Sequence, residues 1–195
     1  MAKLQTPRCE FGLQAPNFIL PGVDDKQWTL EQCRGATGIL VMFISNHCPY
    51  VKAIRQQLVS DVKALRAMGL GVVAINANDS QQYPEESLPF MRSIAQQHNF
   101  NFPYLQDTDQ KIAKAFGAVC TPDFFGFNAM MELQYRGRLD SSDLESPDQE
   151  TPRELVLAMR QIAITGQGPK QQNPGTGCSI KWKKEGADLS QWMTA

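Results

Sequence analysis

Ser45 and Cys48 are the residues of this sequence whose types and spacing best suit covalent chemistry. They lie in the segment S-N-H-C-P at residues 45–49, directly after the apolar run at 38–44. A thiol at the start of a helix is close to unpaired N–H groups and to the positive end of the helix dipole, which favour the thiolate. Cys48 is therefore a candidate nucleophile. The Ser45 hydroxyl could donate a hydrogen bond to its sulfur or could instead cap the helix.

The other reactive side chains are four cysteines and two histidines: Cys9, Cys33, Cys120, Cys178, His47 and His98. Cys120 and Cys178 are candidate resolving thiols, but Cys120 also suits a small buried residue at a strand start, and Cys178 a docking contact of the tail. His47 could perturb the thiol or be a solvated loop residue. Five widely spaced cysteines without C-x-x-C argue against a disulfide-rich secreted domain and a structural zinc site. We expect a reducing, cytoplasmic compartment and neither a metal nor another cofactor.

The composition is that of one globular domain, with 195 residues, 42% hydrophobic residues and a net charge of −1. This charge balance gives no electrostatic basis for binding nucleic acid or an anionic membrane. Apolar runs stay well short of the ~18 residues of a membrane span. The first residues lack the apolar stretch of a secretory signal, so we expect none.

A strand and a helix are expected to position the reactive segment. The run at 38–44 is continuously apolar and rich in β-branched residues, which is typical of a strand covered on both faces. Apolar residues three or four apart between Val51 and Met68 predict a helix, with Pro49 in its first turn. Sites in open α/β sheets form where such a strand ends.

The rest of the pattern predicts an α/β sandwich. We expect a hairpin at 15–30, a strand at 72–77, helices at 87–95 and 107–116, a hairpin at 123–136 and a helix begun by a capping box at 151–154. Asp107 or Thr108 would cap the helix at 107–116, Gly117 would end it, and Gly166 would end the last helix. This order implies right-handed crossovers between parallel strands and an antiparallel hairpin near the end. We expect a loose lead-in at residues 1–14, the domain at 15–166 and a tail at 167–195 that wraps the domain or is partly mobile.

A strand followed by S-x-x-C-P at a helix start resembles the thioredoxin-like superfamily, and within it the alkyl hydroperoxide reductase/thiol-specific antioxidant, or redoxin, branch. A-P-N-F-I-L at 15–20 is similar to the opening of that branch. G-A-V-C-T-P at 117–122 resembles the segment that places a cis-proline beside the active-site thiol, and G-C-S-I-K-W-K at 177–183 resembles the ending of one bacterial redoxin-like group. The resemblance implies a thioredoxin-like three-layer sandwich with an N-terminal β-hairpin extension and a C-terminal tail.

The resemblance also implies residue roles. Ser45 stands where a thioredoxin has the first cysteine of C-x-x-C, so the motif itself cannot form a disulfide. S-x-x-C-P is similar to the T-x-x-C-P of peroxiredoxins, which makes Cys48 the peroxidatic thiol and Ser45 its hydrogen-bonding partner. Four residues would line the substrate groove: His47, Pro49, Thr121 and Pro122. Val41 departs from the proline of peroxiredoxins, and the sequence shows no arginine in place of theirs.

We therefore expect an antioxidant, thiol-dependent oxidoreductase in which Cys48 attacks peroxide or, as the second choice, a protein disulfide. A sulfenic acid at Cys48 would be resolved by Cys120, by Cys178 or by an external thiol such as a thioredoxin or glutathione system. One alternative is a redox-silent thioredoxin-like module that binds an extended peptide beside Pro122. Another is a Cys-to-Ser variant, engineered or trapping, at position 45 of a C-x-x-C thiol–disulfide oxidoreductase.

Overall fold

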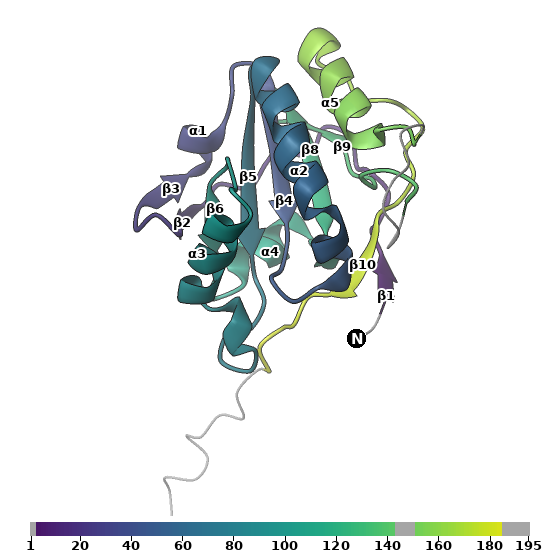
Figure 1. The fold of residues 1–195 in the computed structure, drawn as a ribbon. Helices are drawn as coiled ribbons and strands as arrows, with labels where there is room; N and C mark the ends of the chain where they lie inside the picture. Colours follow the sequence, from purple (N-terminus) through teal and green to yellow (C-terminus); the bar gives the residue numbers. More distant parts are fainter. Residues whose placement is uncertain (1–2, 143–150, 185–195) are drawn as a thin grey trace, which may run out of the picture.

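The computed structural model describes residues 3–142 and 151–184, and its centre is a mixed β-sheet (Figure 1). β4 (Gly38–Phe43) pairs antiparallel with β8 (Asp123–Asn128), which pairs antiparallel with β9 (Leu133–Tyr135). β5 (Leu70–Asn76) pairs in parallel with β6 (Tyr104–Gln106). β5 also lies beside β4, where Ile44 N donates a hydrogen bond to Ile75 O at 3.0 Å. β4 therefore has neighbours on both sides, as its apolar sequence predicts.

Helices and a hairpin cover the two faces of the sheet, which gives three layers (Figure 1). α2 (Pro49–Ala67) and α5 (Glu154–Thr165) pack on one face, together with Met91 of α3 (Leu88–Gln97). On the other face lie α4 (Lys111–Phe116), α1 (Leu30–Cys33) and the hairpin of β2 (Ile19–Pro21) and β3 (Gln27–Thr29). A 3-10 helix, η1 (Pro84–Glu86), precedes α3. None of the helices in the described residues is long and apolar enough to cross a bilayer.

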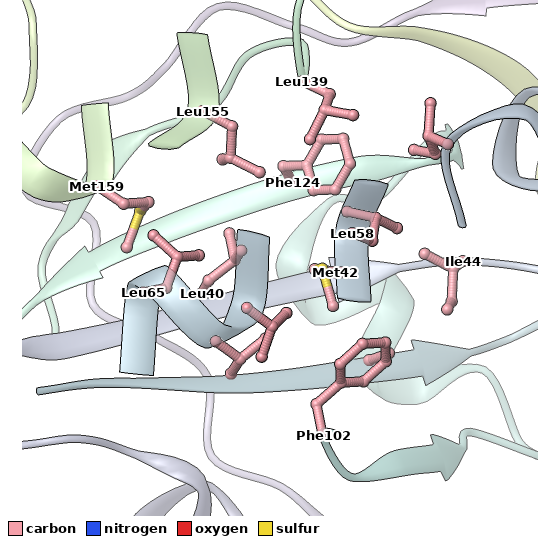
Figure 2. Packing of buried hydrophobic residues seen from close by; sticks show 14 of the residues in the cluster. Leu40, Met42, Ile44, Leu58, Leu65, Phe102, Phe124, Leu139, Leu155 and Met159 are labelled. Carbon is pink, nitrogen blue, oxygen red and sulfur yellow. The ribbon is translucent and has the colours of Figure 1, made fainter. Parts of the chain in front are cut away.

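Alternate residues of β4 separate two hydrophobic clusters. Leu40 and Met42 face α2 and α5, as Figure 2 shows, whereas Ile39 and Val41 face α4 and the β2–β3 hairpin. Successive side chains of a strand point to opposite faces, so a strand buried on both faces needs apolar residues throughout. All six residues of β4 are buried, which confirms the predicted central strand.

The predicted hairpins, buried strands and main helices are confirmed. β2 pairs with β3 and β8 pairs with β9 in antiparallel register, and β5 and β6 supply the predicted parallel pair. α2 covers the predicted range and is followed by Gly69 at φ 81°. The predicted helix stops Gly117 and Gly166 have φ values of 64° and 72°, which glycine adopts without steric cost.

The starts of two helices differ from the local predictions. α5 begins at Glu154 with Arg153 as its N-cap residue, so the capping box at 151–154 does not begin the helix. α4 has Gln110 as its N-cap residue instead of Asp107 or Thr108. Asp107 is buried and accepts a hydrogen bond from Ala113 N at 2.7 Å. Asp107 thus still accepts an N–H group of the first turn of α4, as predicted for a capping side chain, although Gln110 is the N-cap residue.

The chain termini form a small second sheet that the sequence did not predict. Its order is β1 (Lys3–Gln5), β10 (Thr176–Ser179) and β7 (Cys120–Thr121), and both pairings are antiparallel. The expected lead-in is therefore partly a strand, and the tail wraps the domain through an ordered strand. Residues 1–2 of the expected lead-in and 185–195 of the expected tail lie outside the described residues.

Candidate active site around Cys48

Cys48 lies between the end of β4 and the start of α2, as predicted. It is the N-cap residue of α2, and its carbonyl accepts the hydrogen bond from Lys52 N at 2.9 Å. Its side chain is fully buried, and Sγ donates a hydrogen bond to Thr121 O at 3.0 Å. The Thr121–Pro122 peptide bond is cis, as the resemblance implied. The thiol therefore sits at the helix start and against the proline turn, but it is covered by other residues of the chain.

Cys178 is the residue that covers it. β10 pairs antiparallel with β7 so that Cys178 lies opposite Thr121, whose carbonyl also accepts the Cys48 thiol. Cys178 and Cys48 belong to the same buried cluster. Burial, together with the neighbouring Cys48 thiol, raises the pKa of Cys178 to about 11. The structure thus brings the nucleophile candidate together with one of the two candidate resolving thiols.

The other cysteines are placed differently. Cys120 Sγ lies 3.5 Å from Pro122 O, within its own turn, and burial raises the pKa of Cys120. Burial also raises the pKa of Cys33 to about 12 and that of Cys9 to about 11, and both residues belong to the opposite side of the sheet. These three thiols are strongly biased toward the unreactive protonated form.

Ser45 does not donate to the Cys48 sulfur, contrary to the expectation from sequence. Its hydroxyl donates to Glu86 Oε1 at 3.1 Å and accepts a hydrogen bond from Cys48 N at 3.2 Å. The serine therefore holds the backbone of the nucleophile, as a capping residue would, and leaves the sulfur to Thr121 and Cys178. Its role is to position Cys48.

Glu86 organises the whole loop between β4 and α2, and the sequence pattern gave no sign of it. Its buried carboxylate accepts hydrogen bonds from Asn46 N at 3.0 Å, His47 N at 2.9 Å and Asn76 Nδ2 at 2.5 Å. Burial would raise the pKa of Glu86, but hydrogen bonds from His47, Asn46 and Asn76 outweigh it and hold the pKa below its usual range. An ionised carboxylate is thus fixed beside the reactive segment.

His47 neither lines a groove nor points to solvent. Its Nδ1 lies 2.5 Å from Glu86 Oε1, and its ring stacks on Tyr83 with centroids 5.4 Å apart. The His47 side chain is 15% exposed. Of the four residues expected along the groove, Thr121 and Pro122 lie against Cys48, Pro49 is exposed at the start of α2, and His47 is bound to the loop.

Arg55 is a second residue that sequence analysis missed. It lies in α2 two turns after Cys48, is buried, and donates from Nη2 to Asn46 O. Its Nη1 lies 3.2 Å from His98 Nε2. Burial lowers the pKa of Arg55, while the charges of Tyr104, Glu86 and Cys48 oppose that shift. The seven-residue spacing from Cys48, which puts both on one helix face, was the available signal.

A cavity of about 350 Å³ opens beside the proline turn. Its apolar lining includes Tyr50, Ile54, Pro122 and Phe124, and Thr176 of β10 forms part of the wall. The cavity therefore continues the groove in which β10 lies. Within residues 3–142 and 151–184, no group of three or more histidine, cysteine or acidic side chains is arranged to hold a metal ion.

Replacing Ser45 with alanine is expected to lower the free energy of unfolding by about 1 kcal/mol, because Cys48 N and Glu86 lose a hydrogen-bonding partner. Ser45→Thr keeps the hydroxyl and should recover most of the loss. Urea unfolding measures the difference, with Ser60→Ala on the exposed face of α2 as the control. Equal stability of Ser45→Ala and Ser60→Ala would show that Ser45 does not support the loop.

Comparison with known proteins agrees with this geometry. The model of the AhpC/TSA family matches residues 11–138. ResA, a thiol-disulfide oxidoreductase of Bacillus subtilis (strain 168), is 27% identical over 117 residues, which are 60% of this chain and 61% of ResA. The chain thus spans less than two thirds of that curated relative.

Two solved structures show how far the likeness extends. An uncharacterized conserved protein from Geobacillus kaustophilus is 38% identical, with a TM-score of 0.87 over 95% of this chain and 99% of that one. A thiol:disulfide interchange protein of the thioredoxin family from Chlorobium tepidum TLS is 21% identical, with a TM-score of 0.54 over 64% of this chain and 84% of that one. The predicted thioredoxin-like fold is confirmed.

Proposed function

The chain belongs to the AhpC/TSA family, and from that premise we propose that it is a thiol-dependent oxidoreductase whose redox pair is Cys48 and Cys178. One observation carries the proposal: β10 places Cys178 opposite Thr121, whose carbonyl accepts the Cys48 thiol at the start of α2. The similarity to ResA supports thiol redox chemistry in general. The substrate that we propose is a peroxide.

The proposed reaction has two steps within the chain. The Cys48 thiolate attacks one oxygen of the peroxide, the O–O bond breaks, and the leaving oxygen takes a proton and departs as water or an alcohol, so that Cys48 becomes a sulfenic acid. The Cys178 thiol then attacks the Cys48 sulfur, an S–S bond forms, and the sulfenic hydroxyl leaves as water with the proton of Cys178. Two electrons from an external thiol reductant, such as a thioredoxin or glutathione system, restore both thiols.

Cys120 is not the resolving thiol in this proposal. Its Sγ contacts Pro122 O within its own turn, whereas Cys178 lies opposite Thr121, whose carbonyl accepts the Cys48 thiol. The odd number of widely spaced cysteines supports a reducing, cytoplasmic compartment, in which such a disulfide would be transient.

Hydrogen peroxide is expected to convert the reduced full chain into a form lighter by two hydrogen atoms, with Cys48 and Cys178 linked. Peptide mapping by mass spectrometry under non-reducing conditions identifies the bond. In Cys178→Ser the reaction should stop at a sulfenic acid on Cys48, which dimedone traps, while Cys120→Ser should behave as the unaltered chain does. A disulfide through Cys120, or an unmodified Cys48, would contradict the proposal.

A protein disulfide is the second candidate substrate. The similarity to ResA, named a thiol-disulfide oxidoreductase, favours it. Cys48 would then attack one sulfur of the substrate disulfide, form a mixed disulfide and release the other sulfur as a thiol. Cys178 would attack the Cys48 sulfur, form the Cys48–Cys178 disulfide and release the second substrate thiol. Inertness of Cys48 toward both peroxides and disulfides would instead support the redox-silent binding module.

A further inference from the structure

β10 lies where an extended peptide would have to bind in order to reach Cys48. It pairs along the edge of β7 and runs past the start of α2, as the yellow strand in Figure 1 shows. An extended segment that adds to a sheet edge gains main-chain hydrogen bonds and presents alternate side chains to pockets. The residue of β10 that faces Cys48 is Cys178. It lies opposite Thr121 and interacts with the Cys48 thiol.

Gly177 sets how closely β10 approaches the proline turn. A Cβ at this position would lie 2.3 Å from Thr121 O and 3.1 Å from Pro122 N, and both of these are backbone atoms. Real side chains do not tolerate the first of these distances, so any other residue must push the strand away from the turn. β10 can therefore lie this close to the proline turn only because residue 177, next to Cys178, is a glycine.

The seated strand closes Cys48 to solvent. Cys48 is 0% exposed and Cys178 is 4% exposed. Behind β10 lies β1, an exposed strand whose three residues pair with it. A small molecule needs only a slight opening of this edge, whereas an extended peptide needs the whole width of the groove that β10 fills.

β10 is held by strand pairing on both sides and by hydrogen bonds before and after it. Thr6 and Gly175 exchange hydrogen bonds of 2.9 and 2.8 Å before the strand, and Ile180 N donates to Val119 O at 3.2 Å after it. After Ile180, Lys181 N donates to Asn78 Oδ1 at 2.8 Å and Lys181 O accepts from Asp79 N at 2.9 Å. β10 is the central strand of the second sheet, with β7 on one side and β1 on the other, and neither pairing joins it to a strand of the central sheet. A small sheet of short strands can open locally without unfolding the central sheet. The strand that closes the groove can therefore be displaced.

We propose that β10 is a built-in occupant of the peptide groove, which restricts Cys48 to small oxidants and admits extended, cysteine-bearing peptides only when the strand leaves. The inference rests on the proposed redox role of Cys48. It makes Gly177 and the segment 176–179 determinants of substrate class: peroxides react with the closed form, and protein disulfides require the open one.

The test compares a small and a large reagent in the full-length Cys178→Ser chain, where Cys48 reports without a resolving partner. Methyl methanethiosulfonate transfers a methylthio group to the Cys48 thiolate and releases methanesulfinate. A peptide whose cysteine carries a 2-pyridyl disulfide forms a peptide–Cys48 disulfide and releases pyridine-2-thione. Adding Gly177→Ala is expected to raise the peptide rate relative to the small-reagent rate by about tenfold or more, because the competent state becomes more populated.

Gly175→Ala is the matched control. A Cβ there would lie 3.3 Å from Thr6 Cγ2, a side-chain atom that can shift slightly, and not against the proline turn. β10 should therefore remain in place, with the ratio of rates unchanged. The inference is overturned if Gly177→Ala and Gly175→Ala give the same ratio, or if the Cys178→Ser chain alone reacts with the peptide as fast as with the small reagent.

Amide hydrogen exchange of the unaltered chain provides a measurement that does not depend on the folding of Gly177→Ala. The amides of 176–179 are expected to exchange by a local opening, faster than those of β4. Exchange of both strands only by global unfolding would overturn the inference. If Cys48 does not react with peroxide but Gly177→Ala still raises the ratio of rates, the peroxidase proposal is rejected and the proposed role of β10 is retained. If Cys48 reacts with peroxide but Gly177→Ala leaves the ratio unchanged, the proposed role of β10 is rejected and the peroxidase proposal is retained.

Discussion

Replacing Cys48 with serine is expected to lower the rate of peroxide consumption by about 10³-fold or more, to the background of the remaining thiols. The reason is that the thiolate performs the attack and that no other described cysteine is placed to replace it. Burial raises the pKa of Cys33 to about 12 and that of Cys178 to about 11, so both are protonated at neutral pH. Peroxide loss is followed with dithiothreitol as the reductant.

Cys33→Ser is the control for the loss of a buried thiol, because Cys33 packs in the cluster on the opposite face of the sheet. Its rate should equal that of the unaltered chain if the protein stays folded, which circular dichroism verifies. A Cys48→Ser variant that retains more than a small fraction of the rate would place the nucleophile elsewhere and remove the basis of the proposed cycle.

The parts of the fold that follow from short-range pattern were predictable. The apolar run at 38–44 identified β4 because burial on both faces leaves no place for polar residues. The spacing after Cys48 identified α2 because one helix face must be apolar. Gly117 and Gly166 marked helix ends because their positive φ is costly for other residues.

The second sheet was not predictable in this way. β1, β10 and β7 contribute only short, partly polar segments from distant parts of the chain. Such strands carry no periodicity long enough to detect. Their pairing depends on the shape of the finished domain, in particular on the cis peptide at Pro122 and the bare backbone of Gly177.

Of the candidate site, the position of Cys48 was predictable from sequence, whereas its long-range partners were not. The nucleophile position of Cys48 followed from a strand, a proline and a helix, which are local features. Glu86 could not be found, because its five hydrogen bonds to the reactive segment and Asn76 join residues ten to forty-one positions apart. The two roles left open for Ser45 could not be separated for the same reason: its hydroxyl accepts from Cys48 N and donates to a carboxylate that the sequence did not place nearby.

Removing the Glu86 carboxylate is expected to have the largest effect on stability. Glu86→Ala leaves the amides of Asn46 and His47 without their side-chain acceptor and leaves Asn76 Nδ2 with Tyr104 Oη alone. Orphaning several buried donors should lower the free energy of unfolding by about 3–5 kcal/mol. Glu86→Gln retains one acceptor oxygen and should lose less. Urea unfolding at neutral pH measures both variants.

The same carboxylate predicts an acid-dependent loss of stability. The pKa of Glu86 is lower in the folded protein than the ~4.3 of an unfolded chain, so its contribution is complete above that value and is lost as the pH falls through the folded pKa. Between neutral pH and the strongly acidic range, the unaltered chain should therefore lose more free energy of unfolding than Glu86→Gln does. Glu85→Gln, at a neighbouring side chain that is 47% exposed, is the matched control and should follow the unaltered chain. Parallel acid profiles for Glu86→Gln and the unaltered chain would mean that Glu86 is not held ionised by the loop, and the positioning of Cys48 would then need another source.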